Sequence, residues 1–456
     1  MGTALVIGGG PNGLAAAITL ASKGHDVTVL EARAAVGGRT EILADTSTVQ
    51  PWATKSLGLE IEWSETPEWR GADDEGLRPS AANLPAVTAW RGEVDRFAGL
   101  IRALSAAAPP NIRSDASLVS LIGPALHALK LGRADGLELA RVGPLCAQDW
   151  LDEWSIPRDV QAPLIAPALL GTWMGPQSPT SALAVLFYAA LSGQSVVGGM
   201  PALRRALVTK AQATGVTLQT GARVKSIRVD GTQATGVELS DGSHMDADVV
   251  LSTIGPKATL MRLVPARSLP IGEVATVQHV RTRGVVAVST VQLESPVFGG
   301  AERVVLAADN VALERAFDDA KHRRAPRTPC LVVHQSEGEA VVHAFGVAHD
   351  RDDGWSEAGS EHLRARIVEL LKPHGEDGAI GPVTMWTPAD LEAEFGLDGG
   401  HLFHGEFAID QFLSFRPHPK LSGYRTAIDG LVLGGAGMHP AGGFTLAQGV
   451  LAARQV

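Results

Sequence analysis

Short apolar runs and helical spacing alternate at the start of the chain. Residues 3–7 (TALVI) and 26–30 (DVTVL) are rich in β-branched side chains, which is typical of strands. Between them, residues 13–23 carry apolar side chains at the three- and four-residue spacing of one helix face. The pattern predicts a strand, a helix and a second strand, which together form a βαβ unit.

The middle of the chain changes character twice. Residues 60–91 have little periodicity, whereas helical spacing dominates residues 95–191, and this predicts a mainly helical insertion. From Gly198 a helical pattern leads into short alternating runs, separated by Asp-Gly dipeptides at residues 230–231 and 241–242. Because Asp-Gly favours tight hairpin turns, we expect a β-meander here.

Strand-like runs return in the second half. Residues 277–346 contain several of them, and residues 362–373 (HLRARIVELLKP) have helical spacing. This order predicts an antiparallel sheet with helices. Residues 430–454 predict a strand, a glycine-rich turn and a helix.

Composition narrows the class of protein. With 45% hydrophobic and 19% charged residues among 456, the chain has the balance of a folded globular protein and is longer than a single domain of about 100–200 residues. The formal net charge of −10 and the absence of long basic runs predict no nucleic-acid partner. Cys146 and Cys330 are the only cysteines and have no metal-ligand spacing, so we expect neither a disulfide framework nor a metal.

We recognise no targeting signal and no membrane-spanning segment in the sequence. Residues 4–7 are too short for the apolar region of a signal peptide. The most apolar segment, residues 181–191, is about half the length of about 20 residues that a membrane-spanning helix needs. We expect a cytoplasmic protein, and peripheral contact with a membrane stays open.

The first predicted strand runs directly into a glycine motif. Gly8, Gly10 and Gly13 form a GxGxxG pattern between the strand and the helix. In a βαβ unit these glycines allow a tight turn, close approach of a pyrophosphate and close packing of helix on strand. Glu31 ends the second strand, 18 residues after Gly13, where a carboxylate can accept hydrogen bonds from ribose hydroxyls. The motif predicts a dinucleotide site.

The continuation resembles one family of flavoproteins. Gly37, Gly38 and Arg39 follow Glu31 at the spacing of a glycine doublet in amine oxidases and phytoene desaturases. The resemblance implies FAD as the cofactor, with the glycines close to its phosphate and ribityl chain and Arg39 near the flavin or its phosphates. Only one βαβ fingerprint occurs, so no separate NADPH domain is expected.

Two further segments resemble the same family, in its phytoene-desaturase-like branch. Around residues 195–231 (SVVGGMPALRRAL and onward), the resemblance implies that the backbone of Val224 holds the adenine. Residues 430–454 (GLVLGGAGMHPAGGFTLAQGVLAAR) resemble the segment that lies against the pyrophosphate and flavin. The motif and the resemblance together assign these residues to FAD: Gly8, Gly10, Pro11, Asn12, Gly13, Glu31, Ala32, Gly37, Gly38, Arg39, Val224, Gly435, Ala436, Gly437, Gly443 and Phe444.

Signals at both ends and in the middle imply an α/β fold whose doubly wound, Rossmann-like FAD-binding domain is assembled from discontinuous segments. An inserted α+β substrate domain completes it. The predicted FAD-binding segments are 1–75, 191–265 and 421–456; the helical insertion 76–190 and the sheet with helices 266–420 form the substrate domain.

The chain also departs from its relatives. Carotenoid desaturases commonly continue after the glycine doublet with a GFxxDxGP-like stretch, but residues 40–58 (TEILADTSTVQPWATKSLG) stand here. Amine oxidases often carry a lysine in an Ala-Lys pair on a substrate-domain strand, and this chain has Ala287 and Val288. The first departure leaves a carotenoid substrate open, and the second counts against lysine-assisted amine oxidation.

Residues for catalysis and substrate binding carry weaker signals. His439 in the C-terminal glycine turn is the candidate catalytic residue, because histidine can shuttle a proton near pH 7; a packed structural histidine is the alternative. Arg416 is a candidate for a polar substrate group, against an ordinary ion pair. Trp173 and Met174 are candidates to line an apolar tunnel, against ordinary core residues. His401, His404 and Glu406 have loose metal-ligand spacing, but we expect no metal there.

These features predict an FAD-dependent oxidoreductase that removes a hydride to flavin N5 and so desaturates a C–C bond of an apolar, isoprenoid or lipid-like substrate. We expect a small apolar substrate and an electron acceptor such as oxygen or a quinone as partners. One alternative is an amine or amino-acid oxidase, although the chain has only two tyrosines, Tyr188 and Tyr424, for an aromatic cage. The other is a protein that holds flavin without turnover.

Overall fold

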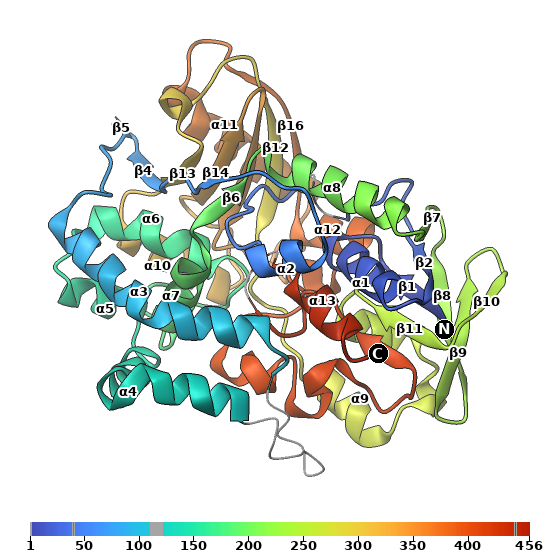
Figure 1. Ribbon diagram of the computed structural model, residues 1–456. Helices are drawn as coiled ribbons and strands as arrows, with labels where there is room; N and C mark the ends of the chain where they lie inside the picture. The colour runs from blue at the N-terminus through green and yellow to red at the C-terminus, as the bar shows by residue number, and fades with distance from the viewer. Residues whose placement is uncertain (1, 39, 41, 110–121, 442, 444) are drawn as a thin grey trace.

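A computed structural model describes the chain except residues 1, 39, 41, 110–121, 442 and 444. A parallel sheet with its helices lies to the right in Figure 1, the helices α3 to α7 lie to the left, and a larger sheet rises between and above them. The fold is α/β, as predicted, with a parallel sheet and a second, mixed sheet.

Five parallel strands in the order β17-β11-β1-β2-β7 form the first sheet. Their bounds are β1 Thr3–Ile7, β2 Asp26–Leu30, β7 Thr217–Gln219, β11 Val249–Ser252 and β17 Leu431–Leu433. Apolar side chains dominate β1 because four of its five residues are buried in the core on the two faces of the sheet. The strands come from three parts of the chain more than 170 residues apart, which confirms that this sheet is assembled from discontinuous segments.

Three helices pack on this sheet: α1 Pro11–Ser22, α8 Gly199–Ala213 and α13 Ala447–Ala453. Helix α1 begins at Pro11, where proline is favoured because the first turn has no use for its missing N–H. It contacts both α8 and α13, so the two ends of the chain lie side by side (Figure 1). A Cβ on Gly449 would lie 2.0 Å from the Asn12 carbonyl oxygen, so only glycine permits this contact between α13 and α1.

The predicted meander follows α8. It consists of β8 Val224–Asp230, β9 Gln233–Leu239 and β10 His244–Asp246, in an antiparallel sheet of order β10-β9-β8. Gly231 and Gly242 have φ angles of +58° and +86°, which glycine adopts without strain. The Asp-Gly turns are therefore confirmed.

The second large sheet has the order β16-β12-β15-β14-β13-β4-β5. Its strands are β4 Arg70–Asp73, β5 Gly76–Leu77, β12 Ala287–Leu293, β13 Arg303–Leu306, β14 Cys330–Ser336, β15 Glu339–Phe345 and β16 Ile380–Trp386. The sheet is antiparallel as predicted, except that β4 runs parallel to β13. Strands β4 and β5 come from the aperiodic stretch 60–91; four- and two-residue strands are too short to show an alternating pattern.

Helices cover both faces of this sheet. On one side α11 Glu357–Leu371, the predicted helix, packs Leu363, Ile367 and Leu371 into the core. The other side faces the helical insertion, whose members are α3 Pro85–Ala106, α4 Ile122–Val142, α5 Ala147–Glu153, α6 Arg158–Leu169 and α7 Ser181–Leu191, together with α10 Asn310–Lys321. The remaining elements are α2 Pro51–Ser56, α9 Ile271–Gln278, α12 Pro388–Phe395, and the strand pair β3 Trp63–Glu65 and β6 Gln194–Val196.

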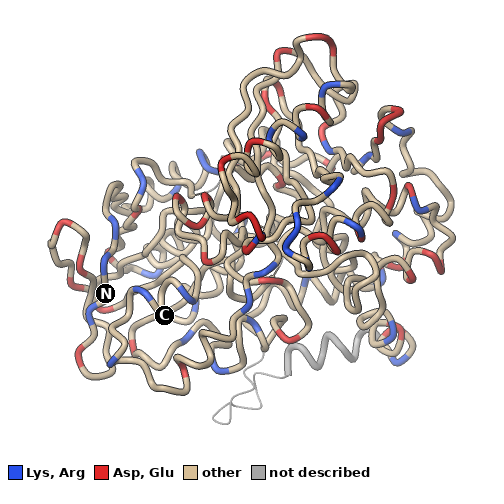
Figure 2. The backbone as a smooth tube through the Cα atoms, turned by 180° about the vertical axis from the view of Figure 1, so that it is seen from behind, with Lys and Arg blue, Asp and Glu red and all other residues tan. Residues whose placement is uncertain are grey.

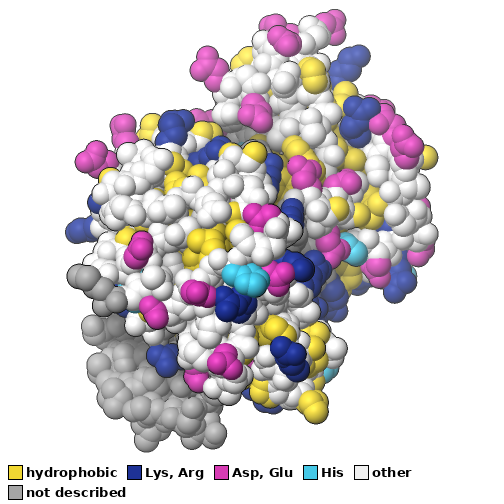
Figure 3. Space-filling model, turned by 90° about the vertical axis from the view of Figure 1, so that its right-hand side faces the viewer, with side chains coloured by type: hydrophobic (Ala, Val, Ile, Leu, Met, Phe, Trp, Pro, Cys, Tyr) yellow, Lys and Arg dark blue, Asp and Glu magenta, His cyan; other side chains and the backbone are white. Residues whose placement is uncertain are grey.

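Charges of both signs alternate along the backbone (Figure 2), and on the face in Figure 3 apolar side chains form small areas between charged ones. In the part of the chain that the structure describes, no helix combines the length and apolarity needed to cross a membrane.

Candidate functional site

The turn between β1 and α1 lets a phosphate approach the backbone closely. Gly8 has φ +98°, and a Cβ on Gly13 would lie 1.9 Å from the Gly8 carbonyl oxygen, so neither position tolerates a side chain. At Gly10 the nearest atom to such a Cβ, Gly38 Cα, is 3.8 Å away. The space in front of Gly10 is therefore open, and the unbonded N–H groups of the first helical turn are available to a phosphate.

Glu31 lies at the end of β2 beside this turn. It is 7% exposed, and its two carboxylate oxygens accept hydrogen bonds from Gly9 N at 2.8 Å and Arg33 N at 2.9 Å. Each oxygen keeps a second lone pair. A carboxylate held in this way can accept further hydrogen bonds from ribose hydroxyls.

The glycine doublet reaches back to the same turn. Gly37 N donates to the Gly9 carbonyl oxygen at 2.8 Å, and Gly38 has φ +59°. A Cβ on Gly38 would lie 2.9 Å from Gly10 Cα. Both glycines therefore bring the loop against the nucleotide turn. Arg39 lies outside the described residues.

The C-terminal glycine turn approaches from the opposite side. A Cβ on Gly435 would lie 2.3 Å from the Thr253 carbonyl oxygen, and a Cβ on Gly437 would lie 2.7 Å from Pro256 Cδ. The two glycines thus let the chain after β17 pass directly over the end of β11. Phe444, which was also assigned to FAD from the sequence, lies outside the described residues.

These segments enclose one cavity, here called the nucleotide cavity, with about 1230 Å³ of empty space. Ten residues assigned to FAD from the sequence line it: Gly8, Gly10, Pro11, Asn12, Gly13, Glu31, Ala32, Gly38, Val224 and Ala436. Glycine cradles, a helix N-terminus and a buried carboxylate fit a dinucleotide. Arg262, Phe395 and His404 also line it. The sequence analysis considered His404 only as part of a loose metal-ligand pattern, and it assigned no role to Arg262 or Phe395.

A second space, the apolar cavity, lies where the helical insertion, the seven-stranded sheet and the loop after Gly38 meet. About 820 Å³ of space that protein atoms do not fill lies between its walls. Most of its wall is apolar: Leu43, Pro167, Ala168, Leu170, Ala184, Phe187, Leu191, Leu402, Phe403 and Phe407. Gly405 lines it, whereas the adjacent His404 lines the nucleotide cavity, so one short segment separates the two spaces.

Gly443 connects the predicted cofactor turn with the apolar cavity. It lines this cavity and has φ +78°, and a Cβ there would lie 2.5 Å from Thr48 Oγ1. The C-terminal turn therefore borders the nucleotide cavity at Ala436 and the apolar cavity at Gly443.

One end of the apolar cavity is polar, and the sequence analysis did not predict it. The Tyr188 hydroxyl donates to Asp45 Oδ2 at 2.7 Å and accepts from Arg303 at 2.6 Å and from Trp69 Nε1 at 3.1 Å. Arg303 also pairs with Asp45 at 3.2 Å. Burial opposes the charge of Asp45, but Arg303, His334 and the hydrogen bonds of Ser47 together outweigh it and hold the pKa of Asp45 below its ordinary value. Burial raises the pKa of Tyr188 to about 12.

Two histidines on neighbouring strands complete this polar end. His334 on β14 and His343 on β15 both line the cavity, with ring centroids 6.3 Å apart. Burial lowers the pKa of His334 to about 3 and that of His343 to about 4, so both rings are neutral at pH 7. No local motif links them with Asp45, because the residues meet only through the tertiary fold.

The structure corrects the predicted role of His439. Its Nε2 lies 3.0 Å from the Leu104 carbonyl oxygen on α3, and it is not among the described residues that line either cavity. Burial lowers its pKa to about 4. His439 therefore joins the C-terminal turn to α3 as a neutral ring, which is the structural alternative to a catalytic histidine.

Arg416 also has a role other than the predicted one. It is 1% exposed, and although it borders the apolar cavity, its guanidinium donates to five backbone carbonyls: those of Gly405, Glu406, Gln411, Ala436 and Met438, at 3.0–3.4 Å. These bonds use its donors, so Arg416 holds two loops together instead of binding a substrate group.

Trp173 and Met174 lie near the apolar cavity but not in its wall. Met174 is buried in the core and accepts a hydrogen bond from Thr180 at 3.4 Å. Trp173 packs edge-on against Phe317, with ring centroids 5.5 Å apart, and lines a smaller neighbouring cavity. The apolar tunnel wall is formed instead by Phe187, Phe403 and Phe407.

The HxxHxE segment is held by protein contacts. Glu406 is 1% exposed and pairs with Arg281 at 2.6 Å and Arg283 at 2.9 Å, while His401 Nδ1 accepts from Phe403 N at 3.0 Å. Among the described residues, no group of three His, Cys, Asp or Glu side chains is placed to hold a metal.

The parallel sheet, the glycine turn and the buried carboxylate define a dinucleotide-binding protein. The chain belongs to the FAD dependent oxidoreductase (DAO) family, whose sequence model matches residues 3–388. FAD is accordingly its cofactor, and the resemblance stated from the sequence is confirmed.

Curated relatives include oxidoreductases and carotenoid desaturases. Pyridine nucleotide-disulfide oxidoreductase domain-containing protein 2 of Rattus norvegicus is 29% identical over 370 residues, 72% of this chain, and the match spans only 64% of that protein's length. Hydroxyneurosporene desaturase of Cereibacter sphaeroides is 26% identical over 97% of this chain and 94% of its own length. Phytoene desaturase of Fusarium fujikuroi is 27% identical over 54% of this chain and 48% of its own.

Solved structures share the fold at low identity. An oxidoreductase from Methanosarcina mazei superposes with a TM-score of 0.59 at 17% identity, covering 99% of both chains. Putrescine oxidase bound to putrescine gives a TM-score of 0.60 at 19% identity, covering 100% of this chain and 97% of the other. These likenesses show the same overall fold and say nothing of the substrate.

Proposed function

We propose that this protein is an FAD-dependent dehydrogenase that desaturates a C–C bond of an apolar, isoprenoid or lipid-like molecule. The apolar cavity carries the proposal. Most of its wall away from the polar end is aliphatic and aromatic, and it borders the same C-terminal turn that reaches the nucleotide cavity. Such a wall favours a hydrocarbon over a small charged molecule.

Desaturation needs little from the side chains. FAD, when bound, supplies a hydride acceptor; a proton leaves the neighbouring carbon, the C–C bond becomes a double bond, and an acceptor such as oxygen or a quinone later takes the two electrons. Gly8, Gly10, Gly13 and Glu31 would hold the dinucleotide. Phe403 and Phe407 would hold the substrate chain and exclude water from the reacting bond.

The relatives support this substrate class. Two of the curated relatives described above are named as desaturases, and one of them aligns over 97% of the chain. The oxidase structures contribute the fold alone, because their identity to this chain is under 25%.

The amine-oxidase alternative has weaker support. Tyr188 is the one tyrosine in the described wall of the apolar cavity, and its hydroxyl is already engaged by Asp45 and Arg303. The other tyrosine, Tyr424, is buried and donates to the His439 carbonyl oxygen at 2.9 Å. Asp45 is neutralised by Arg303, so it offers an ammonium group no unpaired charge.

Product analysis tests the proposal. FAD-loaded protein is incubated aerobically with isoprenoid polyenes, with primary amines and with amino acids. The products are identified by their masses in a mass spectrometer. We expect loss of two hydrogens from at least one polyene and none from the amines. An aldehyde and ammonia released from an amine would replace the proposal with the oxidase alternative, and no product from any compound would favour a flavin-holding protein.

Contact with a membrane surface forms part of the same proposal, because an apolar substrate partitions into lipid. A vesicle-flotation assay with neutral phospholipid vesicles measures it directly: we expect a fraction of the protein to float with the lipid, and none without it.

A further inference from the structure

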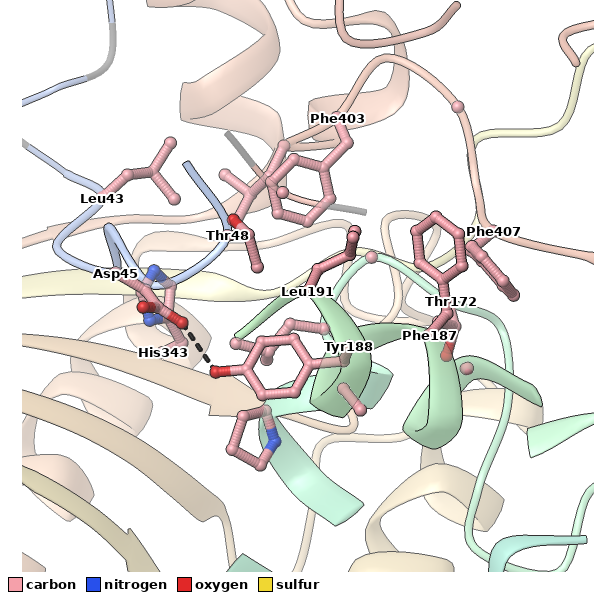
Figure 4. Close-up of a pocket in the computed structure, with 18 of the residues that line it drawn as sticks. Leu43, Asp45, Thr48, Thr172, Phe187, Tyr188, Leu191, His343, Phe403 and Phe407 are labelled. Atoms are coloured by element: carbon pink, nitrogen blue, oxygen red, sulfur yellow. Dashed lines mark hydrogen bonds between the residues drawn. The ribbon is translucent and has the colours of Figure 1, made fainter. Parts of the chain in front are cut away.

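The apolar cavity lies next to an open cleft. This cleft lies between β6, the start of α8 and the seven-stranded sheet, and Asp45 and His334 line both spaces. In the close-up, Phe187 and Phe407 lie on one side of the cavity, while Asp45 and the Tyr188 hydroxyl lie on the other (Figure 4). The polar end of the cavity is therefore the end that borders the cleft.

A single hydrogen bond joins a residue of the cavity wall to a residue of the cleft wall. Tyr188 lines the cavity, Arg303 lines the cleft, and the Arg303 guanidinium donates to the Tyr188 hydroxyl at 2.6 Å. Asp45, which lines both spaces, accepts from Tyr188 at 2.7 Å and pairs with Arg303 at 3.2 Å. These three side chains, here called the barrier, stand between the two spaces.

The framework around the barrier is held in place. Arg303 donates to the Pro67 carbonyl oxygen at 3.0 Å, and its guanidinium lies 4.2 Å from the centre of the Trp69 ring. On the other side, Thr46 Oγ1 accepts from Val196 N at 3.0 Å, which ties the loop next to the barrier to β6. Neither side of the barrier has to move for it to open.

The Tyr188 side chain is the part that can turn aside. It is half-buried, and its hydroxyl is held in the barrier by hydrogen bonds with Asp45, Arg303 and Trp69 Nε1. Water in the cleft can replace such bonds, so each of them contributes little net free energy to the closed position. While it is closed, the barrier keeps the water of the cleft out of the apolar cavity.

The cleft offers apolar surface on the way to the barrier. Val196, Val197, Met200 and Pro201 line it on the side of β6 and α8, and Val197 is 43% exposed. An apolar molecule that leaves water for this wall gains free energy before it reaches the barrier.

We propose that Tyr188 is a gate through which ligands enter the apolar cavity from the cleft. In the closed position its hydroxyl bonds with Asp45 and Arg303, and in the open position the phenol turns aside and an apolar molecule passes. The inference goes beyond the proposed function, because it concerns access and holds for any ligand of this cavity. Tyr188 takes no part in the redox step.

Thiol labelling measures entry without any turnover. Ala184→Cys puts a thiol in the wall of the apolar cavity, one helical turn before Tyr188 on α7. The FAD-loaded protein is treated with N-ethylmaleimide, an uncharged reagent, and the modified peptides are quantified over time by mass spectrometry. Adding Tyr188→Phe keeps the ring but removes the hydroxyl, and we expect the introduced thiol to react about tenfold faster. Asp45→Asn, which removes the ion pair with Arg303, should act in the same direction.

Two controls separate gating from loosening of the whole protein. Tyr424→Phe removes a buried hydroxyl that bonds to the His439 carbonyl oxygen outside the barrier, and it should leave the rate unchanged. The native Cys330, buried in the core, should react equally slowly in every variant. Asp45→Asn carries the test if Tyr188→Phe does not retain flavin. Equal rates with and without the Tyr188 hydroxyl, or a rise at Cys330 in step with the introduced thiol, would overturn the proposal. Because no substrate is used, the result is independent of whether the enzyme desaturates a polyene.

Discussion

Single glycines determine whether the dinucleotide can approach the chain. Gly10→Ala separates folding from binding, because a Cβ at this position has 3.8 Å to the nearest protein atom but projects into the space before the helix N-terminus. We expect unchanged stability of the FAD-free protein and an FAD affinity lower by about tenfold, measured by fluorescence titration. Gly92→Ala, in the exposed middle of α3 with no atom within 4 Å, is the control and should change neither FAD affinity nor folding. If Gly10→Ala binds FAD as tightly as the unaltered protein does, the pyrophosphate does not lie at this turn.

Arg416 is a structural residue at the same scale. Replacing it by Met leaves five buried carbonyl oxygens without their donor, and we expect a loss of about 3 kcal/mol or more in the free energy of unfolding. Arg425→Met removes an exposed arginine that makes one bond to the Gln455 carbonyl oxygen and should cost no more than about 0.5 kcal/mol. Urea unfolding measures both. If Arg416→Met keeps its stability but no longer binds substrate, Arg416 contacts the substrate, as the sequence analysis predicted.

At the scale of elements, the local pattern was sufficient for β1, α1, β2, the meander and α11, because each is defined by a periodicity and its turn residues. The nucleotide turn was predictable residue by residue for the same reason. No periodicity indicates how a side chain is oriented within an irregular turn. For this reason the sequence did not show that His439 and Arg416 bond to backbone carbonyls. The polar end of the apolar cavity was missed because Asp45, Tyr188 and Arg303 are more than 110 residues apart in the chain.

Strands β14 and β15 carry the two neutral histidines, and this has a consequence for acid stability. The unfolded chain binds a proton at each histidine near pH 6.5, whereas burial delays protonation of the folded protein until about pH 4 for His343 and about pH 3 for His334. Between these values the unfolded chain binds more protons, so stability falls as the pH drops from 6.5 to 4. Each histidine contributes about 1.4 kcal/mol per pH unit.

Urea unfolding at pH 7, 6 and 5 measures this slope. We expect His343→Phe to reduce the slope of the unfolding free energy against pH by the contribution of one histidine, because phenylalanine cannot be protonated. A slope that His343→Phe does not alter would mean that His343 is already charged in the folded protein.

At the scale of the whole molecule, one sheet gathers strands from three distant segments, and the loops that follow them enclose two adjoining cavities. The glycine motifs made the cofactor predictable from the sequence alone. The substrate side was less predictable, because the apolar cavity depends on how the helical insertion packs against the seven-stranded sheet. The seam between the cavities, at His404, Gly405 and Gly443, is where cofactor and substrate would meet.

The most direct test of this account is the absorption spectrum of the purified, FAD-loaded protein during anaerobic incubation with an apolar polyene and, separately, with an amine. The account predicts the two visible bands of oxidised flavin at the start and their bleaching by the polyene, with no change on addition of the amine. Bleaching by the amine alone would contradict the proposed desaturation, and a colourless protein that cannot be reconstituted with FAD would contradict the assignment of the nucleotide cavity.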